Sequence, residues 1–247
     1  MTNFTSLPNL IFASSKTSFG NMTLLRGEKE AVIKNRKKFL TSLNIDPKKC
    51  VCMSLVHESD VLEVKEEMIG QGIFKIEETI ECDGLITNKK DIFLFMVIAD
   101  CLPIAFFDPK SESFALIHAS RHNLVKGIIK NTILKFKKLY KTNPKDLIVE
   151  IGPSIGPCCY FESKEKVKRF IDSSLQPYII ETDKTLGCDL WRFAEDLLLT
   201  EGVSKQNLTN QKICTYHSGD YFSHVKFIKE NLPLDTRFAV ILGIKES

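Results

Sequence analysis

The sequence is short of several features that would place it in a specialised class of protein. An excess of one sign of charge is nearly absent, because 34 Lys and Arg are balanced by 31 Asp and Glu, which leaves a net charge of +3. So small a charge gives no electrostatic footprint for a dedicated nucleic-acid binder. Cysteine is also scarce, with eight in 247 residues, whereas a disulfide scaffold needs more than about 8–10%.

Long apolar runs are missing as well. The most apolar stretch, Ile92–Phe107, is interrupted by Asp100, Cys101 and Pro103, and a membrane-spanning helix needs about 20 apolar residues. The first residues, MTNFTSLPNLIFASSKT, lack a basic segment followed by an apolar one, which is the pattern of a signal peptide. We therefore expect a cytoplasmic protein without a membrane partner, in which all eight cysteines stay reduced.

What is present is the composition of a globular protein. Hydrophobic residues make up 43% and charged residues 26% of the chain, close to the average for globular domains. No internal repeat and no linker rich in Gly, Ser or Pro divides the sequence. We predict a single domain over residues 1–247.

The spacing of apolar residues predicts helices around a set of buried strands. Helices are expected at Glu28–Leu43, Asn123–Tyr140, Ser163–Ile171 and Leu190–Leu199. Strands are expected at Cys50–Val56, Val61–Val64, Gly84–Thr87, Phe93–Ile98, Pro103–Phe107, Phe114–Ile117, Leu147–Ile151 and Phe238–Ile244. Strands in the middle of the chain with helices around them favour an α/β or α+β sandwich.

Reactive side chains follow three of these strands. They are His57, Cys101 and His118. Two imidazoles and a thiolate are preferred zinc ligands, and three protein ligands with an open fourth position are the catalytic pattern, in which the metal acidifies a bound water. The same residues could form a metal-free pair in which Cys101 attacks as a thiolate beside His118 or His57. Each could also be structural, because a cysteine after an apolar strand is often a small core residue.

Two carboxylates and a pair of cysteines lie in similar positions. Asp100 ends an apolar run, where a carboxylate needs a partner. Asp83 either forms a turn with Cys82 and Gly84 or binds a polar ligand. Cys158–Cys159 follows a turn-rich loop, which favours a reduced pair over a vicinal disulfide.

Several segments occur together in an order typical of one family. They are V-H-x-x-D-V-L (Val56–Leu62), C-D-G-L-I-T (Cys82–Thr87), A-D-C-L-P-I (Ala99–Ile104), H-A (His118, Ala119), G-P-S-I-G-P-C-C-Y (Gly152–Tyr160) and C-T-Y (Cys214–Tyr216). With these motifs the chain resembles the laccase-domain family, formerly called multicopper polyphenol oxidases. Its members are associated with purine nucleoside phosphorylase and adenosine deaminase activities.

The resemblance implies a fold, a metal site and a reaction. It implies an α+β fold built as an α/β/β/α layered sandwich with mixed sheets, similar to cysteine hydrolases. It implies zinc on His57, Cys101 and His118, with Cys101, His118, Asp83 and Asp100 as catalytic groups. The expected reactions are phosphorolysis of adenosine, inosine and methylthioadenosine, and deamination of adenosine, in which Asp83 or Asp100 carries a proton. Copper is a poorer match, because the chain has only five His and no H-x-H pair for a trinuclear cluster.

The chain departs from the family pattern where phosphate would bind. The usual H-A-G-W-R-G is H-A-S-R-H-N at His118–Asn123, so His122 occupies the arginine position. An imidazole cannot replace the planar fork of a guanidinium on phosphate. We expect phosphate to be held by Lys16, Arg121, His122 or Arg237, and phosphorolysis to be weaker than deamination. Alternatives are a metal-free hydrolase using Cys101 and His118, and a family member that binds a purine or a partner without turnover. The sequence leaves the preferred nucleoside and the oligomeric state open.

Overall fold

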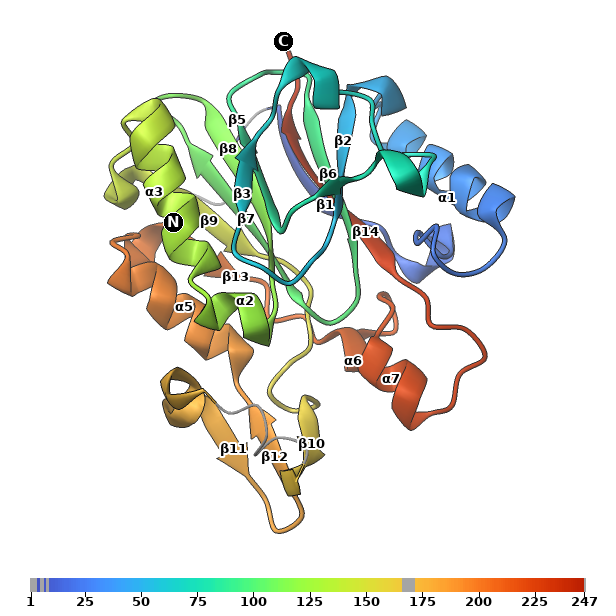
Figure 1. Cartoon of the computed structure of the whole chain (residues 1–247), viewed down its shortest axis with the longest axis vertical. Coiled ribbons are helices and arrows are strands. Elements are labelled where there is room, and N and C mark those ends of the chain that lie inside the picture. Colours follow the sequence, from blue (N-terminus) through green and yellow to red (C-terminus); the bar gives the residue numbers. More distant parts are fainter. Residues whose placement is uncertain (1–3, 5–6, 8, 166–171, 247) are drawn as a thin grey trace.

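Two mixed sheets form the centre of the molecule in the computed structural model, which describes residues 4, 7, 9–165 and 172–246 (Figure 1). The five-stranded sheet has the order β1 (Leu10–Ser14), β14 (Phe238–Ile244), β6 (Phe93–Ile98), β2 (Cys50–Ser54) and β4 (Ile80–Glu81). The six-stranded sheet has the order β13 (Leu208–Asn210), β9 (Ile148–Ile151), β7 (Leu102–Asp108), β8 (Ser113–Ala119), β5 (Gly84–Thr87) and β3 (Val61–Glu63). Both sheets contain parallel and antiparallel pairs, such as parallel β2–β6 and antiparallel β7–β8.

The alternation of side chains along the strands separates three apolar cores. In β6, Leu94 and Met96 face the other sheet, while Phe93 and Phe95 face α1 (Lys29–Ser42). In β8, Phe114 and Leu116 join the core between the sheets. Ala115 and Ile117, two residues of the same strand, pack under α3 (Ile128–Tyr140) and α5 (Leu190–Thr200). The layers therefore run helix, sheet, sheet, helix, as predicted (Figure 1).

The helix predicted at Asn123–Tyr140 is two helices, which corrects the sequence-based expectation. α2 (Arg121–Val125) ends before Gly127, whose backbone is left-handed with φ 86°, and α3 then begins in a new direction. The apolar spacing runs across this break and does not reveal it. Of the helix predicted at Ser163–Ile171, residues 166–171 lie outside the described residues, and Ser163 ends a strand instead.

A small sheet at the lower end of Figure 1 was not expected from the sequence. It consists of β10 (Phe161–Ser163), β12 (Thr185–Cys188) and β11 (Ile179–Glu181). Two short helices near the C-terminus, α6 (Thr215–Ser218) and α7 (His224–Lys229), lie close to it beneath the main sheets. None of the helices in the described ranges combines the length and the apolar character needed to cross a membrane.

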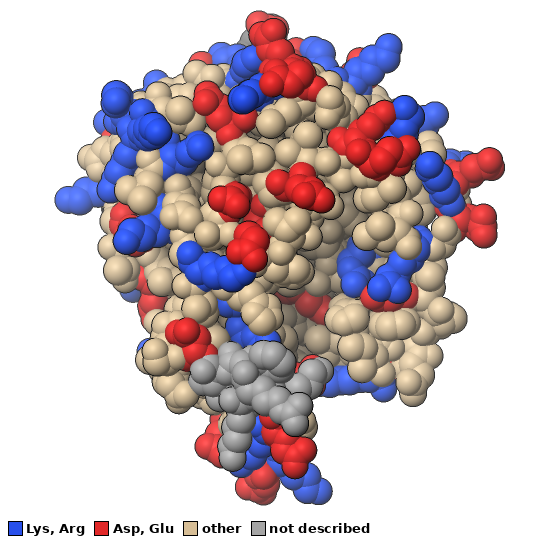
Figure 2. All heavy atoms as spheres, viewed as in Figure 1, with Lys and Arg blue, Asp and Glu red and all other residues tan. Residues whose placement is uncertain are grey.

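Charged side chains are mixed over the face of the molecule seen in Figure 2. Lys and Arg alternate with Asp and Glu, and neither sign dominates this face. This agrees with the small net charge of +3. Recognition of a ligand therefore has to come from local groups rather than from the field of the whole molecule.

Candidate functional site

The three predicted metal ligands lie near one another at one end of the six-stranded sheet, although among the described residues their ligand atoms do not form a group within 4.8 Å of one another. Cys101 directly precedes β7, and the register pairs Leu102 with Ala119 and Pro103 with His118 on β8. The loop between β2 and β3 brings His57 to the same place, with its ring centroid 4.9 Å from that of His118. Adjacent strands thus place an imidazole beside a thiol, as the sequence predicted.

Two residues of these loops have an unusual backbone. His57 has φ 60° and Asp100 has φ 74°, both in the left-handed region. For residues other than glycine this conformation costs about 1–2 kcal/mol. Such strain persists only where the surrounding structure imposes it, and it is concentrated at functional sites.

A buried carboxylate fixes the orientation of His118. Nδ1 of His118 lies 2.7 Å from Oδ1 of Asp83, and the backbone N–H of Glu58 donates to Oδ2 at 2.7 Å. Burial lowers the pKa of His118, but the interactions with Cys101 and Asp83 outweigh it and raise the pKa to about 9. Because Asp83 engages Nδ1, Nε2 is the ring atom left for Cys101 or for a metal ion.

His57 has the protonation state that a metal ligand needs. Its Nδ1 lies 3.3 Å from Oγ of Ser120, which leaves Nε2 for an ion. Burial and the nearby His118 lower the pKa of His57, so the ring is neutral at pH 7. Two imidazoles and one thiolate fit a catalytic zinc ion, and the Asp83 carboxylate behind His118 is the support that metal-bound histidines commonly have.

A cavity of about 430 Å³ opens beside these residues. This volume lies within the range of small-molecule sites, about 300–1,000 Å³. Its lining combines apolar, basic and acidic side chains. The lining residues are His57, Ala99, Asp100, Cys101, Ser120, Arg121, His122, Ile155, Tyr160, Phe161, Glu162, Leu190, His224, Val225, Ile228 and Lys229.

Comparison with known proteins identifies the family. Residues 13–232 match the model of the family described as multi-copper polyphenol oxidoreductase laccase. The chain belongs to this laccase-domain family.

Its relatives include proteins named purine nucleoside phosphorylase and solved structures. The chain is 32% identical over 215 residues to purine nucleoside phosphorylase YlmD of Geobacillus stearothermophilus, covering 83% of this chain and 77% of that protein. It is 27% identical over 243 residues to human purine nucleoside phosphorylase LACC1, covering 96% of this chain but 51% of the human protein. The crystal structure of YlmD from Geobacillus stearothermophilus superposes with a TM-score of 0.86 at 25% identity, covering 97% of this chain and 93% of that one.

Asp100, expected to carry a proton, has both carboxylate oxygens engaged in this laccase-domain protein. Oδ1 accepts a hydrogen bond from Thr215 at 2.6 Å, and Oδ2 accepts one from the backbone N–H of Val225 at 2.7 Å. These bonds tie α6 and α7 to the corner before β7. The contacts favour a positioning role for Asp100, and its part in proton transfer stays a prediction.

Two of the four predicted phosphate-binding residues lie away from the cavity. Nζ of Lys16 is 3.1 Å from Asp220 in an exposed ion pair, and Arg237 donates to Asp235 at 2.9 Å. Neither residue lines the cavity, whereas Arg121 and His122 do. The geometry therefore favours Arg121 and His122 as phosphate ligands in the laccase-domain site.

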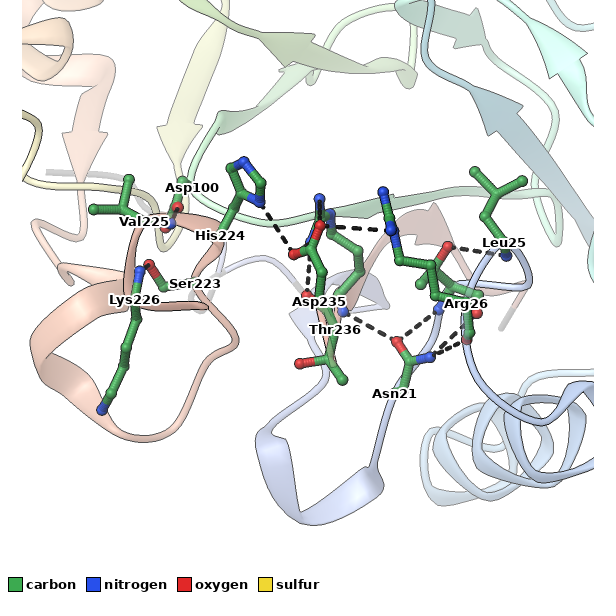
Figure 3. Close-up of polar contacts among 12 residues, drawn as sticks. Asn21, Leu25, Arg26, Asp100, Ser223, His224, Val225, Lys226, Asp235 and Thr236 are labelled. Atoms are coloured by element: carbon green, nitrogen blue, oxygen red, sulfur yellow. Dashed lines mark hydrogen bonds and ion pairs between the residues drawn. The ribbon is translucent and has the colours of Figure 1, made fainter. Parts of the chain in front are cut away.

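The cavity also includes two basic residues that sequence reasoning missed, His224 and Lys229. Nδ1 of His224 lies 3.1 Å from Oδ1 of the buried Asp235, which also faces Nε of Arg26 at 3.6 Å (Figure 3). The only local signal is Ser223, whose Oγ caps α7 by accepting from Lys226 at 3.1 Å. Nothing in that pattern reveals that α7 borders the cavity.

Proposed function

We propose that this laccase-domain protein is a zinc-dependent purine nucleoside phosphorylase that also deaminates adenosine. Relatives across most of the chain carry the name purine nucleoside phosphorylase. The expected substrates are adenosine, inosine and methylthioadenosine, together with phosphate for the phosphorolytic reaction.

The observation that carries the proposal is the mixed lining of the cavity. Ile155, Tyr160 and Ile228 supply apolar and aromatic surface for a purine, while Arg121 and His122 supply donors for an anion. Charge-assisted hydrogen bonds from arginine are the usual means of binding phosphate. The cavity thus has complementary places for a base and for phosphate, next to His57 and Cys101.

The donor set favours zinc over copper. The chain has five His and no H-x-H pair, which does not suit a multinuclear copper centre. Zinc held by His57, Cys101 and His118 would supply a Lewis acid at the floor of the cavity. Asp83 keeps a proton on Nδ1 of His118 and so holds that ring in the orientation a ligand needs.

In phosphorolysis an oxygen of phosphate attacks C1′ of the ribose. The bond between C1′ and N9 breaks, its electron pair stays with the purine, and the purine takes up a proton. The products are ribose 1-phosphate and the free base. Arg121 and His122 would hold the phosphate in line for this attack. Deamination replaces the C6 amino group with oxygen from water and releases ammonia, and it needs no anion site.

The test is phosphate-dependent release of hypoxanthine from inosine by the zinc-loaded protein. We expect Cys101→Ser to abolish release and Arg121→Ala to raise the KM for phosphate. Lys34→Ala, which removes an exposed cation on α1, is the matched control and should behave as wild type. Zinc-loaded protein that binds inosine but releases no base would overturn the proposal and indicate a binding role without turnover.

A metal-free cysteine hydrolase is a second candidate, favoured by the contact between Cys101 and His118. Burial opposes a charge on His118, yet Cys101 and Asp83 raise its pKa to about 9. A thiolate nucleophile would react with iodoacetamide at pH 7. Rapid alkylation of Cys101 in chelator-treated protein, with hydrolase activity that survives the chelator, would favour this candidate over the zinc enzyme.

A further inference from the structure

A second group of metal-ligating side chains lies outside the cavity. Cys158, Cys159, Cys214 and His217 bring one ligand atom each to within 4.8 Å of one another. Cys158 and His217 are exposed, Cys159 is buried and Cys214 is half-buried. None of these four residues belongs to the cavity lining or to the set His57, Cys101 and His118.

Main-chain bonds hold the two segments of this group together. The loop that follows β9 carries Cys158 and Cys159, and Cys214 immediately precedes α6. Ser154 and Cys214 form a parallel β-bridge, in which Ser154 N–H donates to Ile213 at 3.1 Å and Thr215 N–H donates to Ser154 at 3.1 Å. The side chains therefore start from a fixed backbone arrangement.

Two of the distances between ligand atoms are those expected in a tetrahedral site. With zinc bonds of about 2.3 Å to sulfur and 2.05 Å to nitrogen, a sulfur and a nitrogen ligand should be about 3.6 Å apart. Nδ1 of His217 is 3.6 Å from Sγ of Cys158. With Nδ1 as the ligand atom, Sγ of Cys159 lies 3.7 Å from it; the same sulfur also contacts Nε2 at 3.4 Å, so the ring has to turn slightly to bind an ion.

A backbone donor near one of the sulfurs favours its thiolate form. The backbone N–H of Gly156 points at Sγ of Cys214 at 3.3 Å. A thiolate is the form of cysteine that binds metals.

Nearby lysines balance the charge of such a site. Three thiolates and a divalent cation leave one net negative charge. Nζ of Lys229 donates to the carbonyl oxygen of Cys159 at 3.2 Å, and Lys226 and Lys229 lie 5.9 and 5.6 Å from the ring centre of Tyr216. Two positive charges therefore border the group.

We propose that Cys158, Cys159, Cys214 and His217 bind one zinc ion, in a second site that is separate from His57, Cys101 and His118. Three thiolates and one imidazole complete the tetrahedron, which is the closed ligand set of structural zinc. The ion would tie the loop after β9 to α6. Ile155 and Tyr160 belong to that loop and line the cavity, so the ion would steady one wall of the substrate site.

The test is a zinc count on the full-length protein after removal of loosely bound metal. We expect about two zinc ions per chain in the wild type. Cys158→Ser and His217→Asn change exposed residues and should each leave one tightly bound ion. The affinity for the second ion should fall at least about 100-fold, because loss of a group that only supports a metal ligand already costs about 10- to 100-fold. Cys101→Ser should also leave one ion, and Cys50→Ala, a buried cysteine in β2, should keep two.

Cobalt distinguishes the two sites by their number of thiolates. In Cys101→Ser loaded with Co²⁺, three cysteines bind the ion, so the thiolate-to-cobalt absorption should be intense and should fall in the double variant Cys101→Ser, Cys158→Ser. A wild type that holds a single zinc ion, lost in Cys101→Ser, overturns the proposal. So does retention of two ions in both Cys158→Ser and His217→Asn, or a disulfide among the three cysteines of the group in freshly purified protein. Absence of phosphorolysis would not alter these counts, so the two proposals fail independently.

Discussion

At the scale of single residues, His122 decides how well the cavity can hold phosphate. It lies in the wall of the cavity where the family pattern has arginine, and its Nε2 is 3.4 Å from Nη2 of Arg121. Burial and the charges of Arg121 and Lys126 lower the pKa of His122. The ring is therefore neutral at pH 7 and offers phosphate one donor and no charge.

Replacing His122 with arginine should raise phosphorolysis selectively. A charged hydrogen bond of about 1.5–3 kcal/mol corresponds to a gain of about 10- to 150-fold in kcat/KM with inosine and phosphate. Adenosine deamination should change little, because attack by water needs no anion site. The measurement compares base release with ammonia release in the same preparations.

His122→Lys is the matched variant for this experiment. It adds a charge without the planar fork of a guanidinium, so its gain should be smaller than that of His122→Arg. If wild type already releases hypoxanthine only with added phosphate, and His122→Arg brings no gain, then His122 is not the missing anion ligand and Arg121 takes its place.

At the scale of elements, the break between α2 and α3 positions Arg121 and His122 in the wall of the cavity. Ser120 and Asn123 form a reciprocal cap at the start of α2, which fixes Arg121 and His122 in the first turn beside His57. Gly127 then turns the chain with φ 86° so that α3 can lie flat on the six-stranded sheet. A continuous helix would carry α2 away from the site.

Gly127→Ala should destabilise the protein through its backbone alone. A Cβ at this position meets nothing within 4 Å, so the cost is that of a left-handed alanine, about 1–2 kcal/mol. Gly127→Asn should cost less, because asparagine tolerates this conformation better. Urea unfolding measures both free energies. An alanine variant as stable as wild type would show that the break does not depend on a left-handed residue.

At the scale of the whole molecule, packing of the helices on the sheets buries His118 with its proton. The folded pKa of His118 is about 9, above the value of about 6.5 for a free imidazole. In the metal-free protein the protonated imidazole of His118, beside Asp83 and Cys101, therefore stabilises the fold, and this contribution is fully present below pH 6.5. That contribution is lost as the pH rises through about 9. Zinc binding requires the neutral imidazole.

Zinc uptake at this site should therefore release protons. Between pH 6.5 and 9 we expect the imidazolium of His118 to release about one proton for each ion bound, so its protonation alone should lower the apparent affinity about tenfold for each pH unit below 9. Calorimetry in buffers of different ionisation enthalpy counts the protons. Using the Cys158→Ser variant confines the measurement to this site. An affinity that does not change with pH would show that His118 is already neutral in the metal-free protein.

The strands and the nearness of His57, Cys101 and His118 follow from the sequence by itself. Apolar runs such as Phe93–Ile98 predict buried strands from a local pattern, and the motifs around the three residues carry the resemblance from which their nearness was expected. Short loops then leave few ways to arrange neighbouring strands.

Only the tertiary structure decided the remaining features, because they depend on contacts between distant segments. Asp100 meets Thr215 across 115 residues of sequence, and His224 enters the cavity wall from α7. Cys158 and His217 are 59 residues apart, yet they lie in one group with Cys159 and Cys214. A local apolar pattern records which side of a helix or strand is buried. It holds no information on which other segment comes to cover that side, and for this reason the polar partners and the second cysteine group could not be predicted.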